Sequence, residues 1–186
     1  MEEKKVKGTM LIDFVRTIRA NKDKDWNKYL KPEDWDIINS LILPAKWYPY
    51  ELYNRCGTAA FEIIGKGNLE TARYNGQLVA KKLFEGTYKS VISTGDPLKG
   101  LNQYVLMYSS FFNFASLKFK KLGEKHVEIQ HDHNPDDAGN IESYCHQLVG
   151  ILETIVQMTD GKDCKINFGT KEWEGAPETI FEITWQ

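Results

Sequence analysis

The spacing of hydrophobic residues changes close to Phe114, and this change constrains the fold more than any other feature of the sequence. Before it, apolar residues recur every three or four positions; directly after it, Ala115, Leu117 and Phe119 alternate with polar residues. A spacing of three to four places apolar side chains on one face of a helix, and a spacing of two places them on one face of a strand. We therefore predict a helical front half and a back half that contains strands.

The front half carries the start and stop signals of helices. Asp96 followed by Pro97 is the strongest start, because a carboxylate accepts hydrogen bonds from free helix amides and proline is favoured at the first helical position. Proline or glycine closes most of the other apolar segments. The predicted helices cover residues 9–21, 32–44, 50–64 and 68–86, and a fifth begins at 96.

The back half predicts two hairpins separated by one long helix. "FASLKFKKLGEKHVEIQH" and the pair "CKINFGT" and "TIFEITW" alternate as strands, and the helix between them, capped by Asp136 or Asp137, carries one apolar stripe as far as Asp160. We predict an α+β fold in which an N-terminal helical half packs on a four-stranded, mainly antiparallel sheet with the long helix across one face. The predicted organisation is a single domain, 1–186, with a helical half, 1–112, and a ββαββ half, 113–186.

Composition and charge exclude several classes of protein. Apolar residues make up 41% and charged residues 27% of the chain, as in ordinary globular domains. The net charge of −2 gives no attraction to nucleic acid or to an anionic membrane. No apolar stretch is long enough to span a membrane, and the charged start "MEEKKVKG" is unlike a signal peptide. We expect a cytoplasmic protein that binds no nucleic acid.

Four segments together resemble a known superfamily: "ILPAKWYPYELYNRC", "GTAAFEIIGKGN", "VLMYSSFFNF" and the stretch from Gly150 to Gly161. In their order along the chain they are similar to the haem-NO-binding-like superfamily. It includes NO-sensing haem domains, 4-vinyl-reductase domains, transport-particle subunits of the TRAPP type, and an uncharacterised bacterial paralogous family that this chain resembles over nearly its whole length. The resemblance implies helices packed on a four-stranded sheet, often an apolar cavity between them, and commonly a homodimer.

The same resemblance bears on haem. Haem sensing in that superfamily uses a proximal histidine on a helix upstream of a Y-x-S-x-R motif, and here Tyr108, Ser110 and Phe112 echo that spacing with phenylalanine in place of arginine. All histidines of the chain follow this segment: His126, His131, His133 and His146. We therefore expect neither haem nor any other cofactor, with a metal ion as the alternative.

The metal alternative comes from the stretch "HVEIQHDH". Alternation places His131 and His133 on one strand face, turned toward the long helix that carries Cys145 and the later strand that carries Cys164. Imidazole and thiolate are ligands that zinc prefers, and three or four of them are needed. In 4-vinyl-reductase-like relatives a set of C-terminal cysteines is suspected of binding metal, and here Thr179 stands where one of them is expected.

A structural interpretation of the same stretch needs no metal. Both histidines lie beside a predicted loop, so solvent and the neighbouring Asp132, Asp136 and Asp137 can satisfy them. The three cysteines of the chain are widely spaced and form no C-x-x-C pair, so buried, reduced thiols are the simpler expectation.

Aromatic residues form the richest group in the sequence and suggest a binding site. Their structural role is packing between the helices and the sheet; their functional role is to line an apolar pocket or a dimer face. The predicted ligand-binding residues are Trp47, Tyr50, Tyr53, Cys56, Tyr104, Tyr108 and Phe112.

No sequence motif assigns an enzymatic activity. The nucleophile-elbow, phosphate-loop, dinucleotide and H-E-x-x-H patterns are absent. Our leading hypothesis is a non-catalytic sensory or binding module for a small hydrophobic ligand or a signalling partner protein. The alternative is a metal-binding protein that uses His131 and His133 with Cys145 and Cys164.

Overall fold

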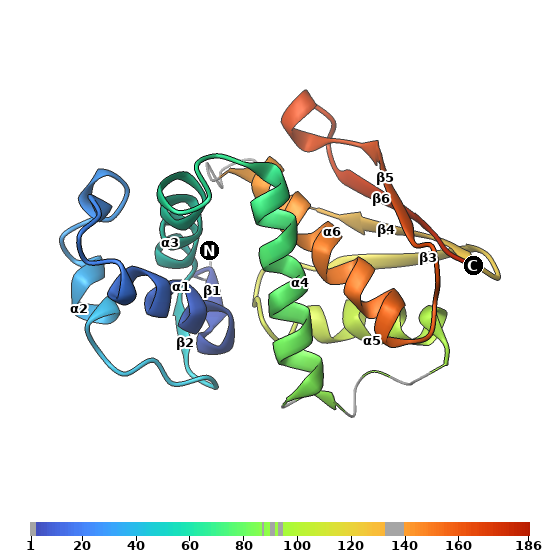
Figure 1. The fold of residues 1–186 in the computed structure, drawn as a ribbon, viewed down its shortest axis with the longest axis horizontal. Helices are drawn as coiled ribbons and strands as arrows, with labels where there is room; N and C mark the ends of the chain where they lie inside the picture. The colour runs from blue at the N-terminus through green and yellow to red at the C-terminus, as the bar shows by residue number, and fades with distance from the viewer. Residues whose placement is uncertain (1–2, 87, 90–91, 93–94, 133–139) are drawn as a thin grey trace. The chain divides into compact units, whose positions relative to one another are not determined.

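The computed structural model describes residues 3–86, 88–89, 92, 95–132 and 140–186. Its chain divides into two compact units (Figure 1). Unit 1 consists of Met1–Asn68 and Ser110–Phe114, and unit 2 consists of Leu69–Ser109 and Ala115–Gln186. The units and the predicted halves therefore divide the chain at different places. The single domain stays a prediction.

Unit 1 is built from helices and a short ribbon of two antiparallel strands. The ribbon pairs Val6 with Tyr48 at its centre. It was not predicted, because strands of three residues are too short to show an alternating pattern. The elements are β1 (Lys5–Lys7), α1 (Gly8–Ala20), a 3₁₀ helix (Trp26–Lys28), α2 (Asp34–Ile38), β2 (Trp47–Pro49) and α3 (Tyr50–Ile63).

Helix α2 is much shorter than the predicted helix 32–44. The side chain of Arg19 donates hydrogen bonds to the backbone carbonyls of Ile38, at 2.6 Å, and of Ser40. Carbonyls at a helix end have no partner within the helix, so a guanidinium there both satisfies them and fixes the chain in its new direction. The prediction was wrong because Pro44 marks only the latest possible end of the helix.

A buried ion pair connects α2 with α3 inside unit 1. Arg55 donates to both carboxylate oxygens of Asp34, at 2.8 and 2.6 Å, and the backbone amide of Lys31 donates to the same carboxylate at 2.8 Å. Burial alone raises the pKa of Asp34, but the hydrogen bonds from Arg55 and Lys31 outweigh it and hold this pKa below its usual value. The ionised pair therefore keeps α2 attached to α3.

Unit 2 contains the predicted four-stranded sheet with a long helix, and it confirms the α+β fold (Figure 1). All neighbouring strands are antiparallel, in the order β3-β4-β6-β5. Its elements are α4 (Leu69–Glu85), α5 (Pro97–Tyr108), β3 (Leu117–Gly123), β4 (His126–His131), α6 (Ile141–Met158), β5 (Lys165–Thr170), the 3₁₀ helix η3 (Glu172–Glu174) and β6 (Thr179–Thr184).

The helix starts of unit 2 follow capping chemistry. The Asp96 side chain accepts a hydrogen bond from the amide of Lys99 at 3.1 Å, as the sequence predicts for the start of α5. Helix α6 is capped by Asn140, whose side chain accepts from the amide of Ser143 at 3.1 Å. The predicted cap, Asp136 or Asp137, was therefore wrong, since the helix begins later in the chain; these two residues lie outside the described residues.

Helices α4 and α6 pack against each other at very short range. A Cβ atom on Gly76 of α4 would lie 1.9 Å from the carbonyl oxygen of Gln147, and one on Gly150 of α6 would lie 1.9 Å from the carbonyl oxygen of Arg73. Only glycine allows two helix backbones to approach this closely. This close crossing explains why α4 belongs to the sheet-containing unit rather than to the predicted helical half.

A second buried ion pair joins the same two helices. Arg73 donates to both carboxylate oxygens of Glu153, with an Nε–Oε2 distance of 2.9 Å, and the side-chain amide of Gln77 lies 3.5 Å from the same carboxylate. Glu153 is only 6% exposed. Burying a carboxylate without such partners is costly, so the pair fixes the rotation of α6 against α4.

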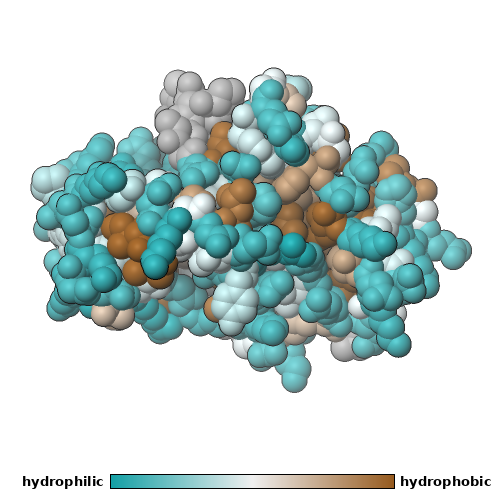
Figure 2. Space-filling model, turned by 45° about the horizontal axis from the view of Figure 1, so that its top comes forward, coloured by the Kyte–Doolittle hydropathy of each residue, from teal (hydrophilic) through white to brown (hydrophobic). Residues whose placement is uncertain are grey.

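No described helix combines the length and apolar character that crossing a membrane requires. Figure 2 shows a face that is mostly hydrophilic, with separate hydrophobic areas. Leu41, Tyr74 and Leu106 are the most exposed of the large apolar side chains.

The glycine crossing predicts an asymmetry between two Gly→Ala substitutions. Gly76→Ala forces α4 away from α6 and should lower the free energy of unfolding by about 1–3 kcal/mol, as overpacking does. Gly57→Ala, on α3, is the matched control, because its Cβ would meet the ring of Phe14 at an ordinary 3.5 Å. It should leave stability unchanged or raise it by up to about 1 kcal/mol, the helix-propensity difference. Urea denaturation followed by circular dichroism measures both; equal stability of the two variants would contradict the close crossing.

Candidate functional site

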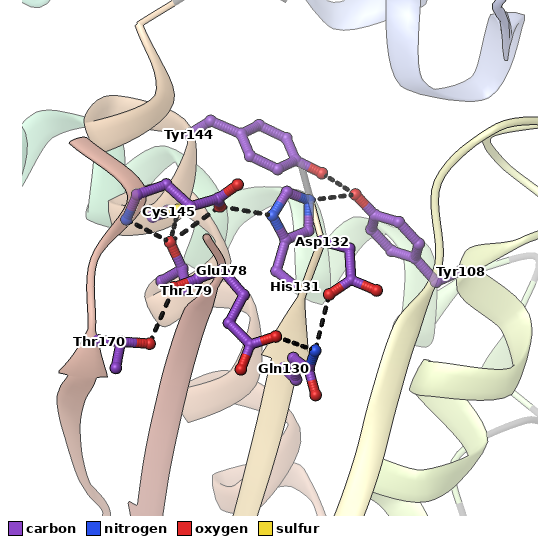
Figure 3. Close-up of polar contacts among 10 residues, drawn as sticks. Tyr108, Gln130, His131, Asp132, Tyr144, Cys145, Thr170, Glu178 and Thr179 are labelled. Carbon is purple, nitrogen blue, oxygen red and sulfur yellow. Dashed lines mark hydrogen bonds and ion pairs between the residues drawn. The ribbon is translucent and has the colours of Figure 1, made fainter. Parts of the chain in front are cut away.

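The most unusual side chain of unit 2 is a buried histidine at the end of β4. Val127, Ile129 and His131 all face the interior, which confirms the strand face predicted for His131, and this residue is only 1% exposed. Its Nε2 lies 3.4 Å from the hydroxyl oxygen of Tyr108 (Figure 3). Its Nδ1 lies 3.5 Å from Oε2 of Glu172. Both ring nitrogens thus have polar partners inside the unit.

Two tyrosines extend this contact to the helices. Tyr108 ends α5 and Tyr144 lies in the first turn of α6, and their hydroxyl groups share a short hydrogen bond (Figure 3). The ring centroid of Tyr144 lies 5.5 Å from that of His131, and the Tyr108 ring is edge-on to it at 6.3 Å. One histidine therefore connects α5, α6 and the sheet.

The carboxylate at the other side of His131 comes from the segment between β5 and β6. Glu172 begins the 3₁₀ helix η3, and its side chain is only 8% exposed. The hydroxyl of Thr179 on β6 donates to Glu172 Oε2 at 3.0 Å and accepts from the amide of Glu172 at 3.2 Å. Sequence reasoning missed Glu172, because "KEWEGAPE" has the composition of a solvated loop. The one available signal was Thr179, a polar residue on the inward face of β6.

Cys145 lies against the same threonine. Its thiol is placed to donate to the Thr179 hydroxyl, with a sulfur–oxygen distance of 3.9 Å. Burial raises the pKa of the Cys145 thiol to about 12. The group is therefore a neutral thiol at physiological pH, not a thiolate.

The expectation that solvent satisfies His131 is wrong, because this side chain is only 1% exposed. The carboxylate of Asp132 forms an ion pair with Lys118 at 2.7 Å and accepts from the Gln130 side chain at 2.7 Å, and the Lys118 contact is the main cause of its lowered pKa. His131 itself is enclosed by tyrosine rings and Glu172. Asp136 and Asp137 lie outside the described residues.

The predicted ligand-binding residues are distributed over both units. Tyr50, Tyr53 and Cys56 are buried on α3 of unit 1, where the ring of Phe112 lies 6.3 and 5.8 Å from the rings of Tyr50 and Tyr53. Trp47 on β2 is half-buried, with the amine of Lys7 4.1 Å from the centre of one of its rings.

The remaining two predicted ligand-binding residues, Tyr104 and Tyr108, are buried on α5 of unit 2, with their ring centroids 6.2 Å apart. Each group of rings is packed within its own unit. A single pocket lined by both groups stays a prediction.

The four predicted metal ligands do not form a site among the described residues. Cys145 contacts Thr179, whereas Cys164 precedes β5 and interacts electrostatically with Glu153 and Arg73. His133 lies outside the described residues. In the described part of the chain no group of three or more His, Cys, Asp or Glu side chains could hold a metal ion. The metal alternative is therefore not supported.

Comparison with known proteins identifies the fold. No protein-family model and no curated protein matches the chain. Among solved structures, an H-NOX protein from S. oneidensis in the Fe(II)NO ligation state matches with a TM-score of 0.69 and 13% identity, over 97% of this chain and 99% of that one. An Fe(II) unliganded H-NOX protein from K. algicida matches with a TM-score of 0.68 and 8% identity, over 97% and 96%. The chain has an H-NOX-like fold.

An H-NOX-like fold raises the question of haem for this chain. At 13% and 8% identity the likeness concerns the fold alone. A third similar structure, with a TM-score of 0.60 and 14% identity over 97% of this chain and 95% of that one, belongs to work on haem distortion in the H-NOX family. The likeness therefore gives no support to the expectation of a protein without haem, and the residues of this chain have to decide whether haem fits.

These residues do not fit a haem held by the superfamily's route. The first histidine of the sequence is His126, so neither α4 nor α5 can supply a proximal imidazole. His131 has Tyr108 and Glu172 at its two nitrogens. The echo of Y-x-S-x-R is divided as well, because Tyr108 belongs to unit 2 while Phe112 is buried in unit 1 and offers no guanidinium.

The buried thiols predict slow chemistry with alkylating reagents. Burial raises the pKa values of Cys56, Cys145 and Cys164 each to about 12. At pH 8 this leaves roughly a thousand-fold less thiolate than a thiol near its usual pKa has, and thiolate is the reactive form. We expect iodoacetamide to modify the native protein far more slowly than the urea-unfolded protein, with Cys164 the first to react because it is only half-buried. Mass spectrometry of timed samples measures this, and rapid native labelling of Cys145 would contradict it.

Proposed function

We propose that this chain is a non-catalytic sensory or binding module that binds a small hydrophobic ligand or a signalling partner protein and does not use histidine-ligated haem. The observation that carries the proposal is an H-NOX-like fold in which His131 is fully buried, with its Nε2 3.4 Å from the Tyr108 hydroxyl and its Nδ1 facing the carboxylate of Glu172. The similar structures are H-NOX proteins in the Fe(II)NO and Fe(II) unliganded states. On this scaffold, a His131 ring that already contacts Tyr108 and Glu172 is compatible with a ligand that makes no bond to iron.

The interior of each unit offers the apolar surface that such a ligand needs. In unit 1, Tyr50, Tyr53 and Phe112 pack edge to face. In unit 2, Tyr104 contacts both Phe84 and Tyr108. Small-molecule sites are mostly apolar with a few polar groups, and these rings with the hydroxyl groups beside His131 have that composition. We propose that Trp47, Tyr50, Tyr53, Cys56, Tyr104, Tyr108 and Phe112 contribute to ligand binding, and that the protein is a cytoplasmic homodimer.

Purification from cells supplied with a haem precursor tests both parts of the proposal. We expect no Soret band in the absorbance spectrum and no stoichiometric iron or zinc by elemental analysis. Native mass spectrometry should show a mass excess over the denatured chain that corresponds to a small organic molecule. Light scattering should give the mass of a dimer.

Two substitutions provide the matched comparison. Tyr53→Ala removes a buried ring from α3 and should reduce the fraction of protein that carries the excess mass, whereas Tyr74→Ala removes a ring that is 59% exposed on α4 and should leave that fraction unchanged. One equivalent of haem that is lost in His131→Ala would overturn the haem-free part. A native mass equal to that of the bare chain, with no interacting protein, would overturn the binding part.

A further inference from the structure

The contacts around His131 determine where its protons lie. An ionised carboxylate has no hydrogen to donate, so the ring nitrogen that faces Glu172 is favoured in its protonated form. The distance of 3.5 Å between Nδ1 and Oε2 lacks hydrogen-bond geometry, and the carboxylate therefore acts through its charge. When the ring is neutral, the proton belongs on Nδ1 and the lone pair belongs on Nε2.

This assignment sets the direction of the next two hydrogen bonds. With a lone pair on Nε2, the hydroxyl of Tyr108 donates to it across the 3.4 Å contact. The oxygen of Tyr108 can then accept, and the hydroxyl that it meets is that of Tyr144. All donors therefore point the same way, from Tyr144 through Tyr108 to His131. Hydrogen bonds aligned head to tail polarise and strengthen one another in a low-dielectric interior.

We propose that Tyr144, Tyr108, His131 and Glu172 form a directed hydrogen-bond relay whose direction reverses when His131 takes up a second proton. The proton comes from solvent and bonds to the lone pair on Nε2. Nε2–H then donates to the Tyr108 oxygen, and Tyr108 in turn donates to Tyr144. Glu172 balances the added charge. One N–H bond forms, one O–H bond of the hydronium ion that supplies the proton breaks, and the tyrosine hydroxyl groups only rotate.

Among the described residues, few groups other than the relay face His131. Across the sheet, its strand neighbours are Leu117 on β3 and Thr179 on β6, which carry no charge. The described titratable groups facing it are Tyr108 from α5, Tyr144 and Cys145 from α6, and Glu172 from η3.

Two further described acids act on the same region electrostatically. Asp132, next to His131 on β4, is paired with Lys118, and Glu142 on α6 influences Cys145. The Cys145 thiol stays neutral because burial raises its pKa to about 12. Among the described residues, Glu172 is thus the carboxylate in direct contact with the imidazole.

The relay gives the proposed module a polar recognition point at Tyr144. Tyr144 is half-buried, whereas Tyr108 is 2% and His131 1% exposed, so Tyr144 is the end closest to solvent. In the neutral relay the Tyr144 hydroxyl donates to Tyr108, and in the protonated relay it accepts from Tyr108. A polar ligand group beside Tyr144 therefore meets a hydroxyl in a different hydrogen-bonding state in each form. This ligand preference rests on the proposed function, whereas the proton positions do not.

Nuclear magnetic resonance of the full chain tests the relay without any ligand. Long-range ¹H–¹⁵N correlation spectra of ¹⁵N-histidine-labelled protein report which ring nitrogen carries the proton. We expect His131 in the Nδ1–H form over the pH range where its ring is neutral. On acidification, the Nε2 proton should appear together with shifts of the Tyr108 and Tyr144 hydroxyl-bearing carbons in ¹³C-tyrosine-labelled protein. His126 and His146 serve as internal references.

Three variants make the test specific. Tyr144→Phe and Tyr108→Phe keep the ring and remove the hydroxyl, so circular dichroism should show an intact fold. In Tyr144→Phe the signal of the Tyr108 carbon should still shift when His131 is protonated. In Tyr108→Phe the signal of the Tyr144 carbon should no longer shift. Tyr74→Phe, on the exposed face of α4, should change neither signal.

The proposal is overturned if neutral His131 carries its proton on Nε2, or if the Tyr108 carbon does not move when the second proton binds. It is also overturned if the Tyr144 carbon still follows His131 in Tyr108→Phe. If the protein carries no ligand but the relay behaves as expected, the relay is supported and only the proposed function is contradicted.

Discussion

The enclosure of helix α6 is the constraint on which unit 2 depends. Gly76 and Gly150 let α4 approach α6 closely, and the start of α6 faces the sheet through Tyr144 and Cys145. A helix enclosed in this way can keep polar side chains only if they find partners inside the protein. Glu153 therefore meets Arg73, and Tyr144 meets Tyr108. The buried His131 belongs to the same network of internal polar contacts, and these contacts determine the chemistry of its ring.

Residue patterns predicted which helices and strands form better than they predicted which of these elements pack together. The Asp96–Pro97 start of α5 and the four alternating strands were predicted correctly, because capping and alternation are local properties. The grouping of α4 with the sheet was not predicted, since an apolar stripe shows that a helix has a buried face and not which element covers it. The β1–β2 ribbon was too short to produce a pattern.

The candidate site shows the same limit. Alternation predicted the side of the strand on which His131 lies, but its partners come from residues 108, 144 and 172, which only the tertiary fold brings together. Glu172 in particular has the sequence context of an exposed loop. Those partners change the conclusion about the histidine, from a strand-end side chain or a metal ligand to the centre of a buried polar network. The proposal of a protein without histidine-ligated haem rests on these partners.

A crystal structure of the protein purified from haem-supplied cells, with anomalous diffraction data at the iron and zinc edges, tests this conclusion most directly. We predict His131 within hydrogen-bonding range of Tyr108 and in contact with Glu172, and no anomalous peak within bonding distance of any imidazole. An iron or zinc peak about 2 Å from a ring nitrogen of His131, at the length of a metal–imidazole bond, would contradict it.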